Sequence, residues 1–136
     1  MMSSTRKFGQ WAEDKSSSYL SDQGFNLIRA NYFSAYGEID LIMQKDDLII
    51  FVEVKARRSI KYGMACETIS QSKQKKIIKT AYHFLDEYPC YEMYNLRFDV
   101  ICIQIKQQVA KSILQDFSLV NYDLEWIKDA FNLDTI

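Results

Sequence analysis

Apolar side chains recur at helical spacing near the start of the chain. Residues 5–22 are expected to form a helix because one face carries Phe8, Trp11, Ala12, Lys15 and Tyr19. Thr5 is a suitable residue to cap the beginning of this helix, and Gly24 suits its end. The pattern therefore predicts an amphipathic helix that packs one face against the rest of the protein.

The hydrophobic pattern then changes to one that is typical of strands. Residues 25–33 predict a first strand, and residues 34–37 predict a loop. Two further runs rich in β-forming residues, 39–44 and 48–56, are separated by Lys45-Asp46-Asp47, which indicates a hairpin turn.

The second half of the chain begins with another helical pattern. Ser70 or Ser72 is expected to open a helix that continues to about Glu87, with Pro89 beyond its end. Strands are expected over 97–106 and within 109–120, and a terminal helix over 124–131. The order αβββαβ predicts an α/β fold in which helices flank a mixed central sheet. Residues 1–136 are expected to form a single domain.

Composition supports a folded domain and argues against membrane insertion. The 136 residues are 48% hydrophobic and include only four Gly and one Pro, which excludes a disordered or collagen-like chain. The longest apolar run, Leu48–Val52, is far shorter than the roughly 20 residues of a membrane span. No apolar segment follows residues 1–7, which argues against a secretory signal. Three cysteines without a C-x-x-C pair are expected to be reduced thiols, so we predict a cytoplasmic protein.

The net charge of −1 conceals a local basic segment. Residues 55–79 contain eight Lys or Arg and one acid, Glu67, so the rest of the chain is acidic. This segment is either a phosphate-binding surface or an ordinary solvated helix and loop.

The hairpin places acidic side chains inside apolar strands. A turn centred on Asp46-Asp47 makes the numbers of facing residues add up to 93, which sets Asp40 opposite Glu53. Facing residues share one side of a sheet, and the period of two adds Lys55 to that side. Two carboxylates in a small site suit Mg²⁺, which keeps several waters and binds substrate phosphates. The alternative is an exposed cross-strand ion pair of Glu38 or Glu53 with Lys55.

The sequence of this hairpin resembles that of a known family. The matching segments are Gly37-Glu38-Ile39-Asp40-Leu41-Ile42 and Phe51-Val52-Glu53-Val54-Lys55-Ala56-Arg57-Arg58. They are similar to the YraN-like family of uncharacterised bacterial proteins. Gly9-x-x-Ala12-Glu13, Asn31, Lys73, Ala81 and Arg97-Phe98-Asp99-Val100 match as well, although Ala12 and Ser16 replace the usual Gly and Ala. The resemblance implies a restriction-endonuclease-like fold with a PD-(D/E)xK site, similar to that of archaeal Holliday-junction resolvases.

The resemblance also implies roles for individual residues. Asp40, Glu53 and the main-chain carbonyl of Val54 would bind Mg²⁺ or Mn²⁺. Lys55 would position or activate the attacking water, and Glu13 would be a third acid that reaches the metal directly or through water.

The basic residues around this motif are candidates for phosphate contacts. On a helical wheel, Lys75, Lys76 and Lys79 face away from the apolar stripe, and Lys73 lies at its seam, within reach of the site. Arg57 and Arg58 directly follow the strand that carries Glu53, and they suit contacts with backbone phosphates.

Three functions therefore remain open at the level of the sequence. The first is a Mg²⁺-dependent endonuclease that hydrolyses DNA phosphodiester bonds, including those of branched DNA, for which a resolvase-like role implies a homodimer. The second is a catalytically silent nucleic-acid-binding module associated with repair or recombination. The third hypothesis is a protein-interaction domain that does not bind nucleic acid, and it predicts no salt-dependent DNA binding.

Overall fold

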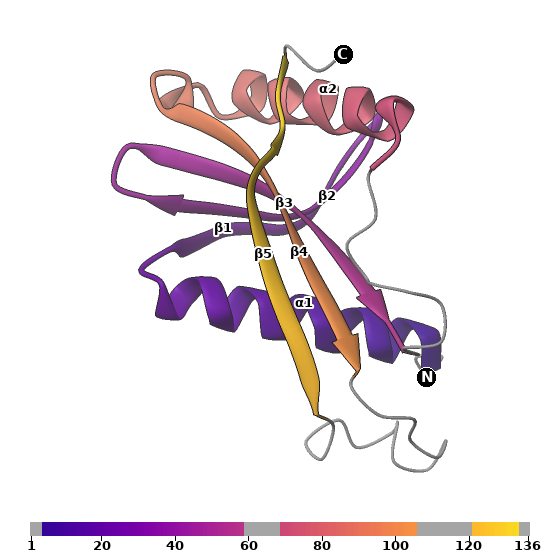
Figure 1. The fold of residues 1–136 in the computed structure, drawn as a ribbon. Coiled ribbons are helices and arrows are strands. Elements are labelled where there is room, and N and C mark those ends of the chain that lie inside the picture. The colour runs from indigo at the N-terminus through magenta and orange to yellow at the C-terminus, as the bar shows by residue number, and fades with distance from the viewer. Residues whose placement is uncertain (1–3, 59–68, 106–120, 134–136) are drawn as a thin grey trace.

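The computed structural model describes residues 4–58, 69–105 and 121–133, which form two long helices and five strands (Figure 1). The elements are α1 (Ser4–Asp22), β1 (Asn26–Ser34), β2 (Gly37–Lys45), β3 (Leu48–Arg57), α2 (Gln71–Glu87), the short 3₁₀ helix η2 (Pro89–Tyr91), β4 (Asn95–Ile105) and β5 (Tyr122–Phe131). The predicted order αβββαβ is confirmed. The additional strand that we expected within 109–120 lies outside the described residues.

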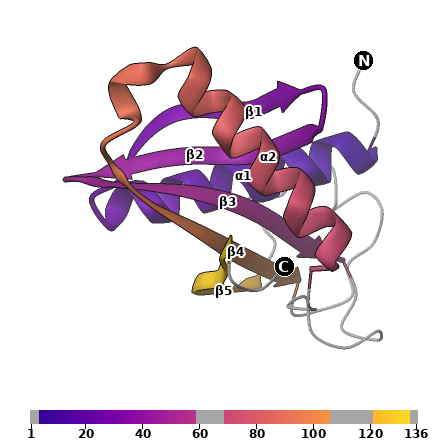
Figure 2. The same cartoon turned by 90° about the horizontal axis from the view of Figure 1, so that it is seen from above.

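The five strands form one mixed sheet in the order β1-β2-β3-β4-β5. Strands β3 and β4 are parallel, and the other neighbouring strands are antiparallel. Helix α2 lies in the connection between β3 and β4, as expected for a parallel pair. Helices α1 and α2 cover opposite faces of the sheet (Figures 1 and 2). The α/β class with a mixed central sheet is therefore confirmed.

Two apolar clusters fill the space between the sheet and the helices. Ile77, Ile78, Ala81 and Phe84 of α2 are buried in the cluster that contains Ile49, Phe51, Phe98 and Val100. Phe8, Trp11, Ala12 and Leu20 of α1 are buried in the cluster that contains Leu41, Ile50, Val52 and Ile101. Successive residues 49–52 of β3 thus lie in alternate clusters, so both faces of the strand are buried. This burial explains why the strand has a continuous apolar sequence.

The predicted ends of the helices are partly confirmed. Ser70 caps α2 by accepting a hydrogen bond from the backbone N–H of Lys73 at 3.2 Å. Gly24 follows α1 at a φ of +95°, which glycine adopts without strain. The cap assigned to Thr5 is wrong because α1 already includes Ser4, so Thr5 lies inside the helix.

The predicted terminal helix over 124–131 is wrong, because Tyr122–Phe131 form strand β5. This strand pairs with β4 in antiparallel register, from Ile105–Tyr122 to Phe98–Phe131. Pairing with β5 gives hydrogen-bond partners to the backbone groups along the edge of β4, a strand that is buried on both faces. This gain from a distant partner outweighs the helical preference of the segment.

A buried carboxylate joins β4 to β5. Asp99 is fully buried and accepts hydrogen bonds from Nε and an Nη of Arg97, from the indole N–H of Trp126 and from the backbone N–H of Asp129. These donors satisfy the charge, and Asp99 therefore has a structural role.

The cysteines differ from the prediction. Cys90 is free and exposed, whereas Cys102 of β4 is disulfide-bonded, so the expectation of three reduced thiols is wrong for Cys102. Within the described ranges, no helix combines the length and the apolar character needed to cross a membrane.

Candidate active site

The hairpin register that brings the acids together is confirmed over most of its length. Strands β2 and β3 pair from Lys45–Leu48 to Leu41–Val52, so the paired numbers add up to 93 as predicted. The side chains of Asp40 and Glu53 line one cavity, but the described ladder of backbone pairs ends before these two residues. Instead, Oδ2 of Asp40 accepts a hydrogen bond from the backbone N–H of Val54 at 2.8 Å. The Asp40 side chain therefore replaces the next rung of the ladder.

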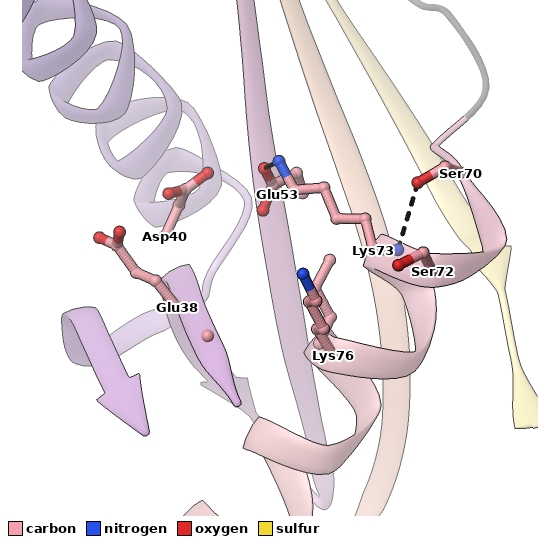
Figure 3. A pocket seen from close by; sticks show the side chains of 9 residues that line it. Glu38, Asp40, Glu53, Ser70, Ser72, Lys73 and Lys76 are labelled. Atoms are coloured by element: carbon pink, nitrogen blue, oxygen red, sulfur yellow. Dashed lines mark hydrogen bonds and ion pairs between the residues drawn. The ribbon is translucent and has the colours of Figure 1, made fainter. Parts of the chain in front are cut away.

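A cavity of about 370 Å³ lies where the two strands separate. Its wall combines β2, β3 and the first turns of α2, and the residues are Gly37, Glu38, Asp40, Glu53, Ser70, Ser72, Lys73, Lys76 and Ile77 (Figure 3). We call this cavity the acidic pocket. The structure thus brings together four predicted site residues, Asp40, Glu53, Lys73 and Lys76.

Lys73 reaches across the acidic pocket to a buried acid. Its Nζ lies 2.6 Å from Oε1 of Glu53, whose side chain is only 10% exposed (Figure 3). Burial lowers the pKa of Lys73, but the hydrogen bond and the negative charges of Glu53 and Asp40 raise it more, so the net shift is upward. Lys73 is therefore a protonated counter-charge for Glu53 at neutral pH.

The other acids remain in an unfavourable electrostatic environment. Burial, followed by the negative charge of Glu53, raises the pKa of Asp40 from 3.8 to about 8. Burial and the negative charge of Glu53 also raise the pKa of Glu38, and the positive charge of Lys73 offsets only part of this rise. Repulsion among these acids thus favours a proton on Asp40 near neutral pH, and a bound cation would relieve that repulsion.

Glu13 approaches this group from α1. Burial raises its pKa, and so does the charge of Glu38, whereas a hydrogen bond with Asn31 lowers it. Its Oε1 is buried without a hydrogen-bond partner among the described residues. In that part of the chain no three acidic, His or Cys side chains are grouped to hold one metal ion. Direct ligation by Glu13 stays a prediction.

Several predicted residues lie away from the acidic pocket. Lys55 is half-buried two positions beyond Glu53 on β3, and it is not part of the described lining. Arg57 ends β3, and the guanidinium of Arg58 lies 4.8 Å from the ring centroid of Phe8, on the α1 side. Lys75 and Lys79 are exposed on α2. Their proposed phosphate contacts stay predictions.

Sequence reasoning missed the two serines in the lining, Ser70 and Ser72. The available signal was their position: a residue that caps a helix lies within one turn of Lys73, which was already expected to face the site. Glu38, which the sequence offered as a possible ion-pair partner of Lys55, is also part of the lining.

The residues of the acidic pocket fit a divalent cation with few protein ligands. Asp40 and Glu53 supply oxygens from neighbouring strands, and the orphaned Oε1 of Glu13 lies in the same electrostatic group. Mg²⁺ is commonly held by one or two carboxylates, with waters and substrate phosphates as its other ligands. A pair of acids is therefore a sufficient protein share for such an ion.

The sequence is similar to proteins from several bacteria. The model of a family described as "Uncharacterised protein family UPF0102" matches residues 12–103. A UPF0102 protein of Acinetobacter baumannii (strain AYE) is 50% identical over 129 residues, covering 95% of this chain and 97% of the relative. Relatives from Acinetobacter baylyi and Chloroherpeton thalassium are 49% and 37% identical, over 92% and 96% of this chain and 89% and 97% of their own.

Proposed function

The chain belongs to the uncharacterised protein family UPF0102, and we propose that it is a metal-dependent endonuclease that hydrolyses phosphodiester bonds in DNA. The observation that carries this proposal is the acidic pocket. Two carboxylates from adjacent strands, Asp40 and Glu53, face the same cavity as Lys73 and Lys76. The resemblance to restriction-endonuclease-like proteins with a PD-(D/E)xK site points to the same chemistry.

In the proposed site, Asp40 and Glu53 hold Mg²⁺ or Mn²⁺, with the carbonyl of Val54 as a further ligand. The bound ion would supply an activated water and would stabilise the charge that develops on the phosphate. The hydrogen bond from the Val54 N–H fixes the carboxylate of Asp40 before any ligand binds. This fixed orientation lowers the entropic cost of forming the site.

The two lysines of the acidic pocket suit the substrate phosphate. Lys73 already extends to Glu53, and Lys76 projects into the same cavity from the next turn of α2 (Figure 3). If Glu53 were bound to a metal ion, the ammonium of Lys73 would be available to a phosphate oxygen. Lys55 stays the proposed residue for positioning the water. Cleavage of both strands of a branched DNA would need a homodimer.

One observation favours a second candidate, a catalytically silent DNA-binding module. The Lys73–Glu53 ion pair already neutralises one of the two acids that a metal needs. A protein that keeps this pair would still offer the exposed lysines of α2 to phosphates. The two candidates differ in whether a divalent cation enters the acidic pocket.

Calorimetric titration with Mg²⁺ and with Mn²⁺ tests the proposal directly. We expect binding by the unmodified protein and none by Asp40→Asn or Glu53→Gln. The matched control is Asp86→Asn, which changes an exposed acid near the end of α2 and should bind as the unmodified protein does.

Cleavage of duplex, flapped and four-way DNA is then measured with the same variants and with Lys55→Ala. Metal-dependent cleavage that the three site variants abolish would support the endonuclease. No metal binding with or without an uncleavable DNA, together with salt-dependent DNA binding, would overturn it in favour of the silent module.

A further inference from the structure

We propose that the tip of the β1–β2 hairpin is a stacking site for unpaired nucleotide bases, beside the acidic pocket. The hairpin tip consists of residues 33–37, and it presents two aromatic side chains to solvent. Phe33 is 67% exposed and Tyr36 is 51% exposed. The inference rests on the proposed function in that both require DNA, and it narrows the substrate to DNA with unpaired nucleotides.

Both aromatic residues lie next to residues of the acidic pocket. Phe33 pairs with Glu38 in the β1–β2 ladder, so the two side chains share one side of the sheet. Tyr36 directly precedes Gly37, and both Glu38 and Gly37 line the pocket. A nucleotide that stacks on either ring would therefore lie close to one whose phosphate enters the pocket.

The hairpin tip is held against α2 by a specific hydrogen-bonded contact. The hydroxyl oxygens of Ser34 and Thr80 are 2.8 Å apart, and Thr80 donates its own proton to the carbonyl of Lys76. The two hydroxyls thus share a hydrogen bond that joins the hairpin tip to α2. The oxygen of Ser34 also accepts a hydrogen bond from the backbone N–H of Tyr36 at 3.0 Å. Tyr36 is thus placed by a fixed turn, which reduces the entropy lost when a base stacks on it.

Close packing at Gly37 reinforces this contact. A Cβ built on Gly37 would lie 3.7 Å from Cβ of Lys76, so the backbone of the tip runs along the surface of α2. The Tyr36 side of the tip and the lysines of α2 are therefore parts of one surface. Phe33 alternates with Tyr32 and Ser34, which face α2, and so it lies on the other side of β1.

Positive charge accompanies the exposed ring of Tyr36. Nζ of Lys79 lies 5.5 Å from the ring centroid of Tyr36, and Lys75 and Lys76 are exposed on the same helix. Proteins that bind single strands combine aromatic rings that stack on bases with cations that follow the phosphates. Lys79 lies beside the Tyr36 ring and Lys76 beside Gly37, and these cations match the negative charge of a phosphate backbone. Charge complementarity therefore favours nucleic acid as the occupant.

Binding of fluorescent DNA without cleavage tests the inference. The probes are a single strand, a duplex with a single-stranded flap and a fully paired duplex, each carrying one 2-aminopurine, in buffer with Ca²⁺ and no Mg²⁺. Base stacking contributes about 1–3 kcal/mol, so Phe33→Ala and Tyr36→Ala should each weaken binding of the single strand and flap about tenfold. They should also remove the quenching of 2-aminopurine, whereas affinity for the paired duplex should change by less than about twofold.

Two control variants identify the cause of any loss. Tyr36→Phe keeps an aromatic ring and should restore stacking. Met93→Ala removes an apolar side chain that is 89% exposed, near the opposite end of β2, and should bind like the unmodified protein. Circular dichroism of each variant verifies folding.

The outcomes separate this inference from the proposed hydrolysis. Normal single-strand binding by both alanine variants, an equal loss for paired and unpaired DNA, or no DNA binding by the unmodified protein would overturn the stacking site. If the alanine variants lose the quenching and the unmodified protein cleaves no DNA, the stacking site would be supported and only the endonuclease would be overturned.

Discussion

Replacement of Asp40 by asparagine is expected to stabilise the folded protein at alkaline pH. Burial and the charge of Glu53 raise the pKa of Asp40 from 3.8 to about 8 in the folded state. Between about pH 4 and about pH 8, the folded protein therefore holds a proton on Asp40 that the unfolded chain has lost. The stability contributed by this proton is complete below about pH 4 and is lost as the pH rises through about 8.

The size of this effect follows from the shift in pKa. Each unit of difference between the folded and unfolded states corresponds to about 1.4 kcal/mol, so the shift sets a ceiling of roughly 6 kcal/mol. The effect should fall below this ceiling, because relaxation and water penetration reduce the cost of a buried charge in proteins. We therefore expect Asp40→Asn to gain about 2–3 kcal/mol in free energy of unfolding at about pH 9, and little at about pH 4. The asparagine oxygen can still accept the hydrogen bond from Val54.

Urea unfolding at several pH values, without divalent cations, measures this gain. The stability of the unmodified protein should fall between about pH 5 and pH 9, and that of Asp40→Asn should fall less steeply. Asp86→Asn is the matched control, because Asp86 is exposed and its loss should leave the slope unchanged. Equal slopes for the unmodified protein and Asp40→Asn would refute the electrostatic reasoning, even if the variant differed in overall stability.

Three further variants test other contacts. Lys73→Met should lower the free energy of unfolding by about 1 kcal/mol without metal, because Glu53 loses its counter-charge, and by less with saturating Mg²⁺. An equal loss in both conditions would contradict this role. Asp99→Asn should lower the free energy of unfolding by about 3 kcal/mol and alter the fluorescence of Trp126. The reason is that four N–H groups donate to the Asp99 carboxylate, which would lose its charge. An unchanged thermal midpoint would argue against that account. Ser70→Ala should cost about 1 kcal/mol through loss of the α2 cap, as measured by thermal unfolding followed by circular dichroism.

The hairpin shows how far the sequence could predict the site. Asp46 and Asp47 form a two-residue turn, and a short turn fixes the pairing of every residue that follows it. The register was predictable for that reason. The end of the ladder was not, because it depends on a side chain, Asp40, that bonds to the backbone of the neighbouring strand at Val54.

Lys73 and Lys55, two of the lysines in the proposed mechanism, illustrate the same limit. The helical wheel could place Lys73 at the edge of the apolar stripe, but only the packing of α2 on the sheet sets its 2.6 Å contact with Glu53. The period of a strand could place Lys55 on the same side as Glu53. It could not show that the pocket ends at Glu53, because that depends on how β2 and β3 separate.

Strand β5 was mispredicted because its conformation depends on a distant partner. The segment contains good helix formers, Glu125, Lys128 and Ala130, and its exposure alternates only in its first half. Local preference therefore favoured a helix. Pairing with the open edge of β4 stabilises a strand instead, and no local pattern in residues 122–131 indicates that such an edge is present.

The early end of the β2–β3 ladder also orders the events of folding. Pairing can spread from the Asp46-Asp47 turn to Leu41–Val52 through local contacts alone, which form fast. The next step would bring Asp40 and Glu53 together, and their repulsion opposes it. The balancing charge, Lys73, arrives only when α2 docks across the sheet, a contact between residues 20 positions apart. We therefore expect assembly of the acidic pocket to be a late, salt-sensitive step that follows closure of the hairpin.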